Sequence, residues 1–82
     1  GTLASGTSIS DTATEVVSAA SNADFVFIKN TGSTDVLITL DNSNYLILLS
    51  EGEAFASEIS VDANVKVKTA SGTSTIDSFL ET

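Results

Sequence analysis

Short runs of β-branched and aromatic residues, separated by turn-forming residues, recur along the chain from residue 24 onward. The clearest is Val65-Lys66-Val67-Lys68, whose strict alternation points the valines to a core and the lysines to water. No window sustains an apolar stripe with helical spacing, and the runs recur about every 8–12 residues. The sequence therefore predicts an all-β fold of about six to eight antiparallel strands, in a small β-sandwich, a jelly-roll-like fold or a short barrel.

Turn-forming residues divide the β region into segments. We expect strands at residues 25–28, 36–40, 45–49, 65–68 and 75–80, and a shorter strand or bend at 54–56. Gly32, Asn42 and Gly72 mark three of the turns between them. The first two strands are expected to pair as a hairpin, and so are the last two.

Residues 1–22 differ in composition from the rest of the chain. Gly, Ser, Thr, Ala and Asn dominate them, and Leu3, Ile9, Val16 and Val17 are the only sizeable apolar residues. We interpret this segment as an N-terminal extended arm joined to a β-sandwich domain of residues 23–82. The arm is either loosely ordered or ordered by lying on a neighbouring chain. Residues 14–18 can form a short strand within it.

The segments 25–28 and 45–49 are apolar at every position, whereas a strand with one solvated face should alternate. Either the extra side chains lie under a loop, or the second face packs on another subunit. A chain of 82 residues without cysteine has a marginal core that oligomerisation would strengthen. We therefore predict a homo-oligomer. The candidate interface residues are Phe25, Phe27, Tyr45, Ile47 and Leu49, together with Leu3 and Ile9 of the arm.

Residues suited to catalysis are scarce. The chain has no cysteine and no histidine, which excludes Ser–His and Cys–His catalysis and zinc sites built from those residues. Glu51 and Glu53 could act as a carboxylate pair only in a cleft, which a sandwich of this size rarely encloses. We predict that the protein is not an enzyme and uses no cofactor and no small-molecule substrate.

Oxygen-bearing side chains gather in two turns, and these allow two interpretations. Calcium binds carboxylate and amide oxygens in loops, but the spacing here matches no EF-hand. Asp and Asn are also the residues that tight turns use to bond their own backbone. The residues concerned are Asp41, Asn42, Asn44, Asp62 and Asn64.

The charge is strongly negative, with eleven carboxylates, three lysines and a net charge of −8. This charge disfavours binding to nucleic acid and to anionic membranes, and it would complement a basic partner surface. No apolar run approaches the length of about 18 residues that a membrane-spanning helix needs.

Three segments resemble small β proteins encoded among the structural genes of tailed bacteriophages. The segment Phe27–Val36 resembles their first hairpin, Leu49-Ser50-Glu51-Gly52-Glu53 resembles the end of their next strand, and Val65–Leu80 resembles their final hairpin. The resemblance covers residues 24–82 and implies a virion structural protein on the capsid exterior. It would be a decoration or cement protein that binds the major capsid protein and bridges capsid subunits, as a trimer by analogy with threefold capsid positions.

A recognition module is the alternative function. The same small β architecture would suit a receptor- or carbohydrate-binding module of a phage fibre, a tail or a cell-surface protein. Sugar binding usually needs exposed aromatic rings backed by polar side chains. The chain has no tryptophan and a single tyrosine, which argues against that alternative.

Overall fold

The computed structural model describes all 82 residues, and it confirms the all-β prediction with eight strands and one short 3₁₀ turn, η1 (Ala19–Ser21). That turn has three residues, so the structure has no helix that could cross a membrane. The strands are β1 (Thr2–Ile9), β2 (Thr14–Val17), β3 (Phe25–Asn30), β4 (Val36–Thr39), β5 (Tyr45–Leu49), β6 (Ala54–Glu58), β7 (Val65–Lys68) and β8 (Ser74–Glu81).

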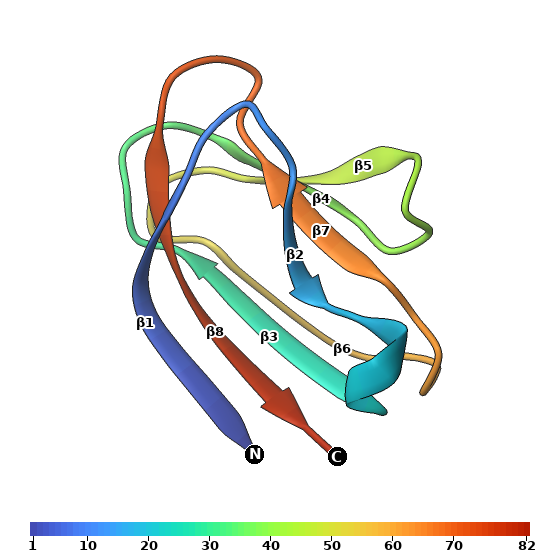
Figure 1. Ribbon diagram of the computed structural model, residues 1–82. Helices are drawn as coiled ribbons and strands as arrows, with labels where there is room; N and C mark the ends of the chain where they lie inside the picture. Colours follow the sequence, from blue (N-terminus) through green and yellow to red (C-terminus); the bar gives the residue numbers. More distant parts are fainter.

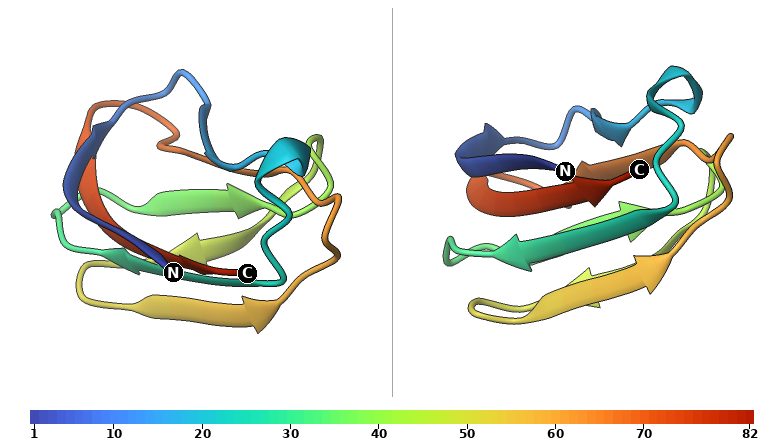
Figure 2. Two further views of the ribbon diagram at one scale, coloured as in Figure 1. Left: turned by 60° about the horizontal axis from the view of Figure 1, so that its bottom comes forward. Right: turned by 90° about the horizontal axis from the view of Figure 1, so that it is seen from below.

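The strands form two four-stranded sheets, which we call the β3 sheet and the β4 sheet. The β3 sheet has the order β1-β8-β3-β6 and the β4 sheet has the order β2-β7-β4-β5 (Figure 1). All neighbouring strands are antiparallel, and no strand pair joins the two sheets. The fold is therefore an open sandwich and not a closed barrel. Figure 2 shows the two layers, with both chain ends on the β3 sheet.

Side chains that alternate inward from both sheets form the core. Val65 and Val67 are fully buried, whereas Lys66 and Lys68 lie on the opposite face and stay partly exposed, as the alternation predicts. Most of the core residues are β-branched, a shape that packs well on a pleated sheet. The apolar core consists of Ile9, Val17, Ala23, Val26, Ile28, Val36, Ile38, Leu49, Val65, Val67 and Ile76.

The prediction of a first and a last hairpin is wrong. β3 and β4 lie in different sheets, and so do β7 and β8. The physical reason is that β3 already pairs on both sides, with β6 and β8, and β8 pairs with β1 and β3. The connections therefore cross between layers that are about 10 Å apart. The only hairpin of two consecutive strands is β4–β5, and its turn contains Asn42 with a positive φ of 68°.

The segment of residues 1–22 is part of the sandwich and not the separate arm that its composition suggested. β1 pairs with β8 at the edge of one sheet, and β2 pairs with β7 at the edge of the other. Ile9 and Val17 point inward and are buried. The small polar residues between them do not prevent this, because each of them carries the backbone N–H and C=O groups that pair strands.

A buried asparagine holds the end of the sandwich where β3 leaves its sheet. The Nδ2 of Asn30 donates to the carbonyl oxygens of Thr34 and Leu49, each at 2.9 Å. Its Oδ1 accepts from the Gly32 amide at 3.0 Å and from the Ser74 hydroxyl at 2.8 Å. A Cβ at Gly32 would collide with the side chain of Ser74 and with the backbone nitrogen of Thr75. Glycine is therefore needed in this turn for close approach.

Candidate functional site

The seven candidate interface residues separate into core residues and surface residues. Ile9 and Leu49 are 2% and 5% exposed and are covered within a single chain, so they offer no surface to a partner. Leu3 is exposed at the edge strand β1. The other four are half-buried, and they lie on β3 and β5: Phe25, Phe27, Tyr45 and Ile47.

One apolar surface is the outer face of the β3 sheet, which we call the phenylalanine face. Val26 and Ile28 are buried in the core, so the alternating Phe25 and Phe27 point outward. The strand register places Phe79 of β8 directly between Phe27 and Leu3. Side chains directly opposite one another in a sheet contact each other. We define the face by Leu3, Phe25, Phe27 and Phe79.

Acidic residues border the phenylalanine face. Phe25 lies opposite Glu81 on β8 and opposite Glu58 on β6. A shallow hollow of about 360 Å³ lies beside it, lined by Asp24, Phe25, Glu58 and Ile59. The carboxylates of Asp24 and Glu58 accept no hydrogen bond and form no ion pair within the chain. This face therefore combines an apolar centre with an acidic rim at the Phe25 end, while Lys29 lies on the same face at the other end of β3, opposite Asp77.

The second apolar surface is the edge at β5, which we call the leucine edge and define by Leu40, Leu46 and Leu48. Leu46 is 87% exposed and Leu48 is 53% exposed. Leu46 is the extra residue of a bulge in the pairing of β5 with β4, and such a bulge displaces a side chain outward. Sequence reasoning named Tyr45 and Ile47 in this strand but missed these leucines. The sequence did contain a signal for them. Side chains of a strand point alternately to its two faces, so a strand that is apolar at every position exposes some apolar side chains.

An open hollow of about 340 Å³ adjoins the leucine edge. Its wall is mostly apolar, and one carboxylate and one amide lie at its rim. The lining residues are Ile38, Leu40, Asp41, Asn44, Leu46 and Ile47.

The carboxylate of Asp41 organises the β4–β5 turn. It accepts hydrogen bonds from the amides of Ser43 and Asn44 at 3.0 and 2.8 Å, from the Asn44 side chain at 2.7 Å and from the Thr39 hydroxyl at 2.8 Å. These bonds, the one from the Asn44 amide above all, hold the pKa of Asp41 well below its usual range. Of the two interpretations of the Asx-rich turns, the structure thus shows the self-bonding one at Asp41. No group of three or more acidic side chains is close enough to hold a metal ion.

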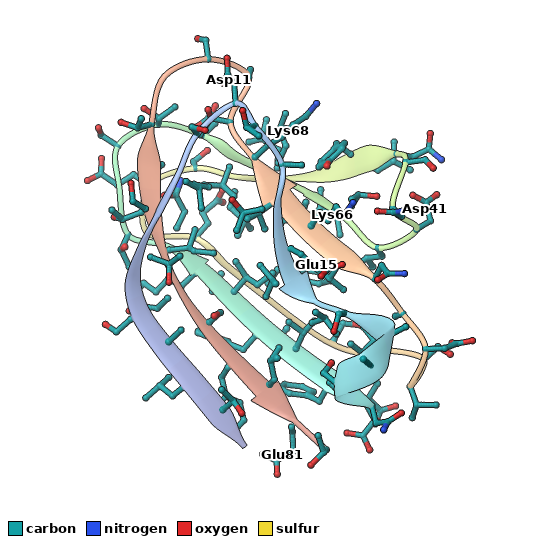
Figure 3. All side chains as sticks on the ribbon, in the orientation of Figure 1. Asp11, Glu15, Asp41, Lys66, Lys68 and Glu81 are labelled. Atoms are coloured by element: carbon teal, nitrogen blue, oxygen red, sulfur yellow. The ribbon has the colours of Figure 1, made fainter.

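The three lysines form no ion pair with a carboxylate, although Lys29 lies opposite Asp77 and Lys66 opposite Glu15 in the strand register. Lys66 and Lys68 are on the outer face of the β4 sheet, with Glu15 opposite Lys66 on the neighbouring strand (Figure 3). The Lys68 ammonium lies over the Tyr45 ring, 4.4 Å from its centre. The only ion pair joins the terminal amine to Glu81 at 3.9 Å. Asp41, Glu53, Asp62 and Asp77 accept hydrogen bonds within the chain, and the other carboxylates, apart from Glu81, make no such contact and are free to interact with a partner.

No family model, curated protein or solved structure matches the chain. What is shown is a small all-β protein of two antiparallel sheets with two apolar surfaces and an acidic periphery.

Proposed function

We propose that the chain is a structural protein of a tailed-phage virion that attaches to the outside of the capsid and reinforces it by bridging neighbouring subunits. The observation that supports this most is the large number of carboxylates that form no ion pair within the chain. Eleven carboxylates lie on one small domain, and only Glu81 forms an ion pair within it. Such a surface favours a basic partner, and the charge would also speed docking.

The phenylalanine face has the composition of a contact surface. Protein interfaces combine an apolar centre rich in aromatic residues with a polar rim. Phe27 and Phe79 provide the centre, and Glu58 and Glu81 stand in the rim. A lysine- or arginine-bearing capsid surface would meet both parts at once.

Residues 1–22 form two strands of the sandwich and are not a free arm that could span two capsid subunits. The sandwich itself must therefore provide the bridge. The domain measures 30 × 24 × 16 Å along its principal axes. A single copy has limited reach, so we propose that joined copies hold several capsid subunits together. Joined copies convert weak single contacts into firm attachment.

The aromatic residues favour attachment over the glycan-binding alternative. The outward-facing phenylalanines are only half-exposed, the polar neighbours of Phe25 are acidic rather than neutral, and the Tyr45 ring is capped by Lys68. A sugar platform needs an accessible ring face.

Co-sedimentation with empty shells, assembled from the major capsid protein of the same virion, tests the proposal. The test variant is Glu58→Lys with Glu81→Lys, on the rim of the phenylalanine face. The control is Asp11→Lys with Asp62→Lys, which changes the net charge equally in exposed turns. We expect saturable, salt-sensitive binding that the test variant weakens by at least about tenfold more than the control.

Two outcomes would contradict the proposal. The first is an absence of saturable binding to shells. The second is an equal loss in both variants, which would indicate nonspecific attraction. Binding to cells or to glycans in the absence of shell binding would support the recognition alternative instead.

A further inference from the structure

The four edge strands of the sandwich differ in how they are protected from other chains. β1 is interrupted at Ser5 and Gly6, which both donate to the Asp77 carboxylate. β2 and β6 carry Glu15 and Glu58. β5 is apolar at all of its five positions, Tyr-Leu-Ile-Leu-Leu. Charges and bulges are the usual devices against edge-to-edge association. β5 has a bulge at Leu46 but carries no charge.

Exposed apolar side chains gather at the same strand. The structure has five large apolar residues that are exposed, and Leu40, Leu46 and Leu48 are three of them. The protruding Leu46 stands at the wall of the hollow of about 340 Å³, which Ile38 and Ile47 also line. A protrusion and a recess thus lie within one patch. A twofold interface requires a patch that fits its own copy, and an adjacent protrusion and recess meet that requirement in kind.

We propose that the leucine edge is the site of twofold self-association, in which Leu46 of each copy lies over the hollow of the other. The partner is a second copy of this chain. The inference rests on the proposed function only for the use of the dimer, which would supply the joined copies that bridge capsid subunits.

Charge supports a second copy as the occupant. A chain of net charge −8 repels its own copies over most of its surface, and β5 has no carboxylate. The strand register places Lys68 in the same row as Leu48, while Asp41 stands beyond Leu46 towards the turn. An antiparallel contact centred on Leu46 therefore brings Asp41 of one copy towards Lys68 of the other. The two ends of the patch are complementary in charge.

The size of the patch sets the expected strength. A standard interface takes about 800 Å² from each partner. The leucine edge is one strand and its turn on a chain that exposes 4341 Å² in all, and we expect it to supply less than that standard area. The association is then weak in solution and becomes effective where copies are concentrated on a lattice. This twofold contact would replace the trimer that the resemblance implied.

A cysteine cross-link tests the twofold geometry without shells. The chain has no cysteine, so Leu46→Cys introduces a single thiol. Only a contact that brings residue 46 next to its own copy, with Cα atoms within about 7 Å, allows this variant to form a disulfide-linked dimer. The matched control is Leu3→Cys, since Leu3 is 74% exposed but lies at the far edge strand β1. We expect rapid dimer formation by the first variant and little by the control.

Sedimentation velocity over a range of concentrations provides the second measurement. Leu46→Ser should raise the dimer dissociation constant at least about a hundredfold, because each dimer buries the side chain twice. Leu3→Ser should leave it within about twofold of the unmodified chain, since the side chain lies outside the contact. Both substitutions are at exposed positions, and an unchanged thermal midpoint shows that the fold is intact.

Three outcomes would overturn the inference: a monomer at all concentrations, a trimer mass, or equal cross-linking of the two cysteine variants. Shell binding by a strictly monomeric chain would refute the leucine-edge dimer and the bridging by joined copies, and it would leave the attachment to the capsid standing. A leucine-edge dimer that binds no shells would refute the proposed function and leave the dimer standing.

Discussion

Asn30 shows how a single side chain fixes the arrangement of the two sheets. Its bond from the Gly32 amide is local and is the kind of turn that an Asn-Thr-Gly sequence predicts. Its bonds to Leu49 and Ser74 join residues 19 and 44 positions away. No local pattern specifies those partners, so the sequence predicts a turn at Gly32 but does not predict that Asn30 is fully buried.

We expect Asn30→Ala to destabilise the fold strongly. The substitution leaves two carbonyls and two donors without their partner, and each buried polar group left unsatisfied costs about 1–3 kcal/mol. The loss should total at least about 3 kcal/mol, or a fall of about 12 °C or more in the thermal midpoint. Asn30→Asp has the same shape but turns a carboxylate towards the two carbonyls, so it should fare no better. A midpoint within about 2 °C of the parent for either variant would refute this role.

Asp41 predicts a pH dependence. Its folded pKa lies below that of the unfolded chain, so it contributes stability above the ordinary aspartate pKa of about 4 and loses it as the pH falls. Asp41→Asn should therefore lower the thermal midpoint at pH 7, and the difference from the parent should shrink below about pH 4. Asp11→Asn, in the exposed turn after β1, is the control. A difference that grew towards low pH would contradict this assignment.

At the scale of elements, the strand positions from residue 24 onward followed from the sequence, whereas β1 and the strand pairing did not. Residues 45–49 and 65–68 were predicted as strands and are β5 and β7, because alternation and β-branching are local signals. Pairing depends on which edges are already occupied. Both edges of β3 pair with other strands, β6 and β8, and the sequence of the turn after β3 gives no information about this.

The N-terminal segment gives the sharpest prediction at this scale. Deleting residues 1–9 removes β1, exposes the edge of β8 and takes Ile9 out of the core. Removing a buried isoleucine alone costs about 2–5 kcal/mol, a large share of the stability of a small domain. We expect no cooperative thermal unfolding in near-ultraviolet circular dichroism. A truncated chain that unfolded cooperatively near the parent midpoint would restore the arm hypothesis.

At the scale of the whole molecule, the acidic charge and the excess of apolar residues were evident in the sequence, and their distribution was not. Register decides that Phe25 points outward and Leu49 inward, although both were candidates for the same interface. Register also places Lys66 opposite Glu15 and Lys29 opposite Asp77. A composition can predict that a chain associates, but the faces that associate depend on the assembled sheets.

The most direct test of the proposed function is the number of copies bound per shell at saturation, measured by the mass of native shells and read together with their rupture temperature. A protein that occupies defined lattice positions should reach a plateau at a fixed ratio to the capsid subunit, and the decorated shells should rupture at a higher temperature than bare ones. Binding that rises without a plateau, or a plateau that leaves the rupture temperature unchanged, would contradict a reinforcing role on the capsid.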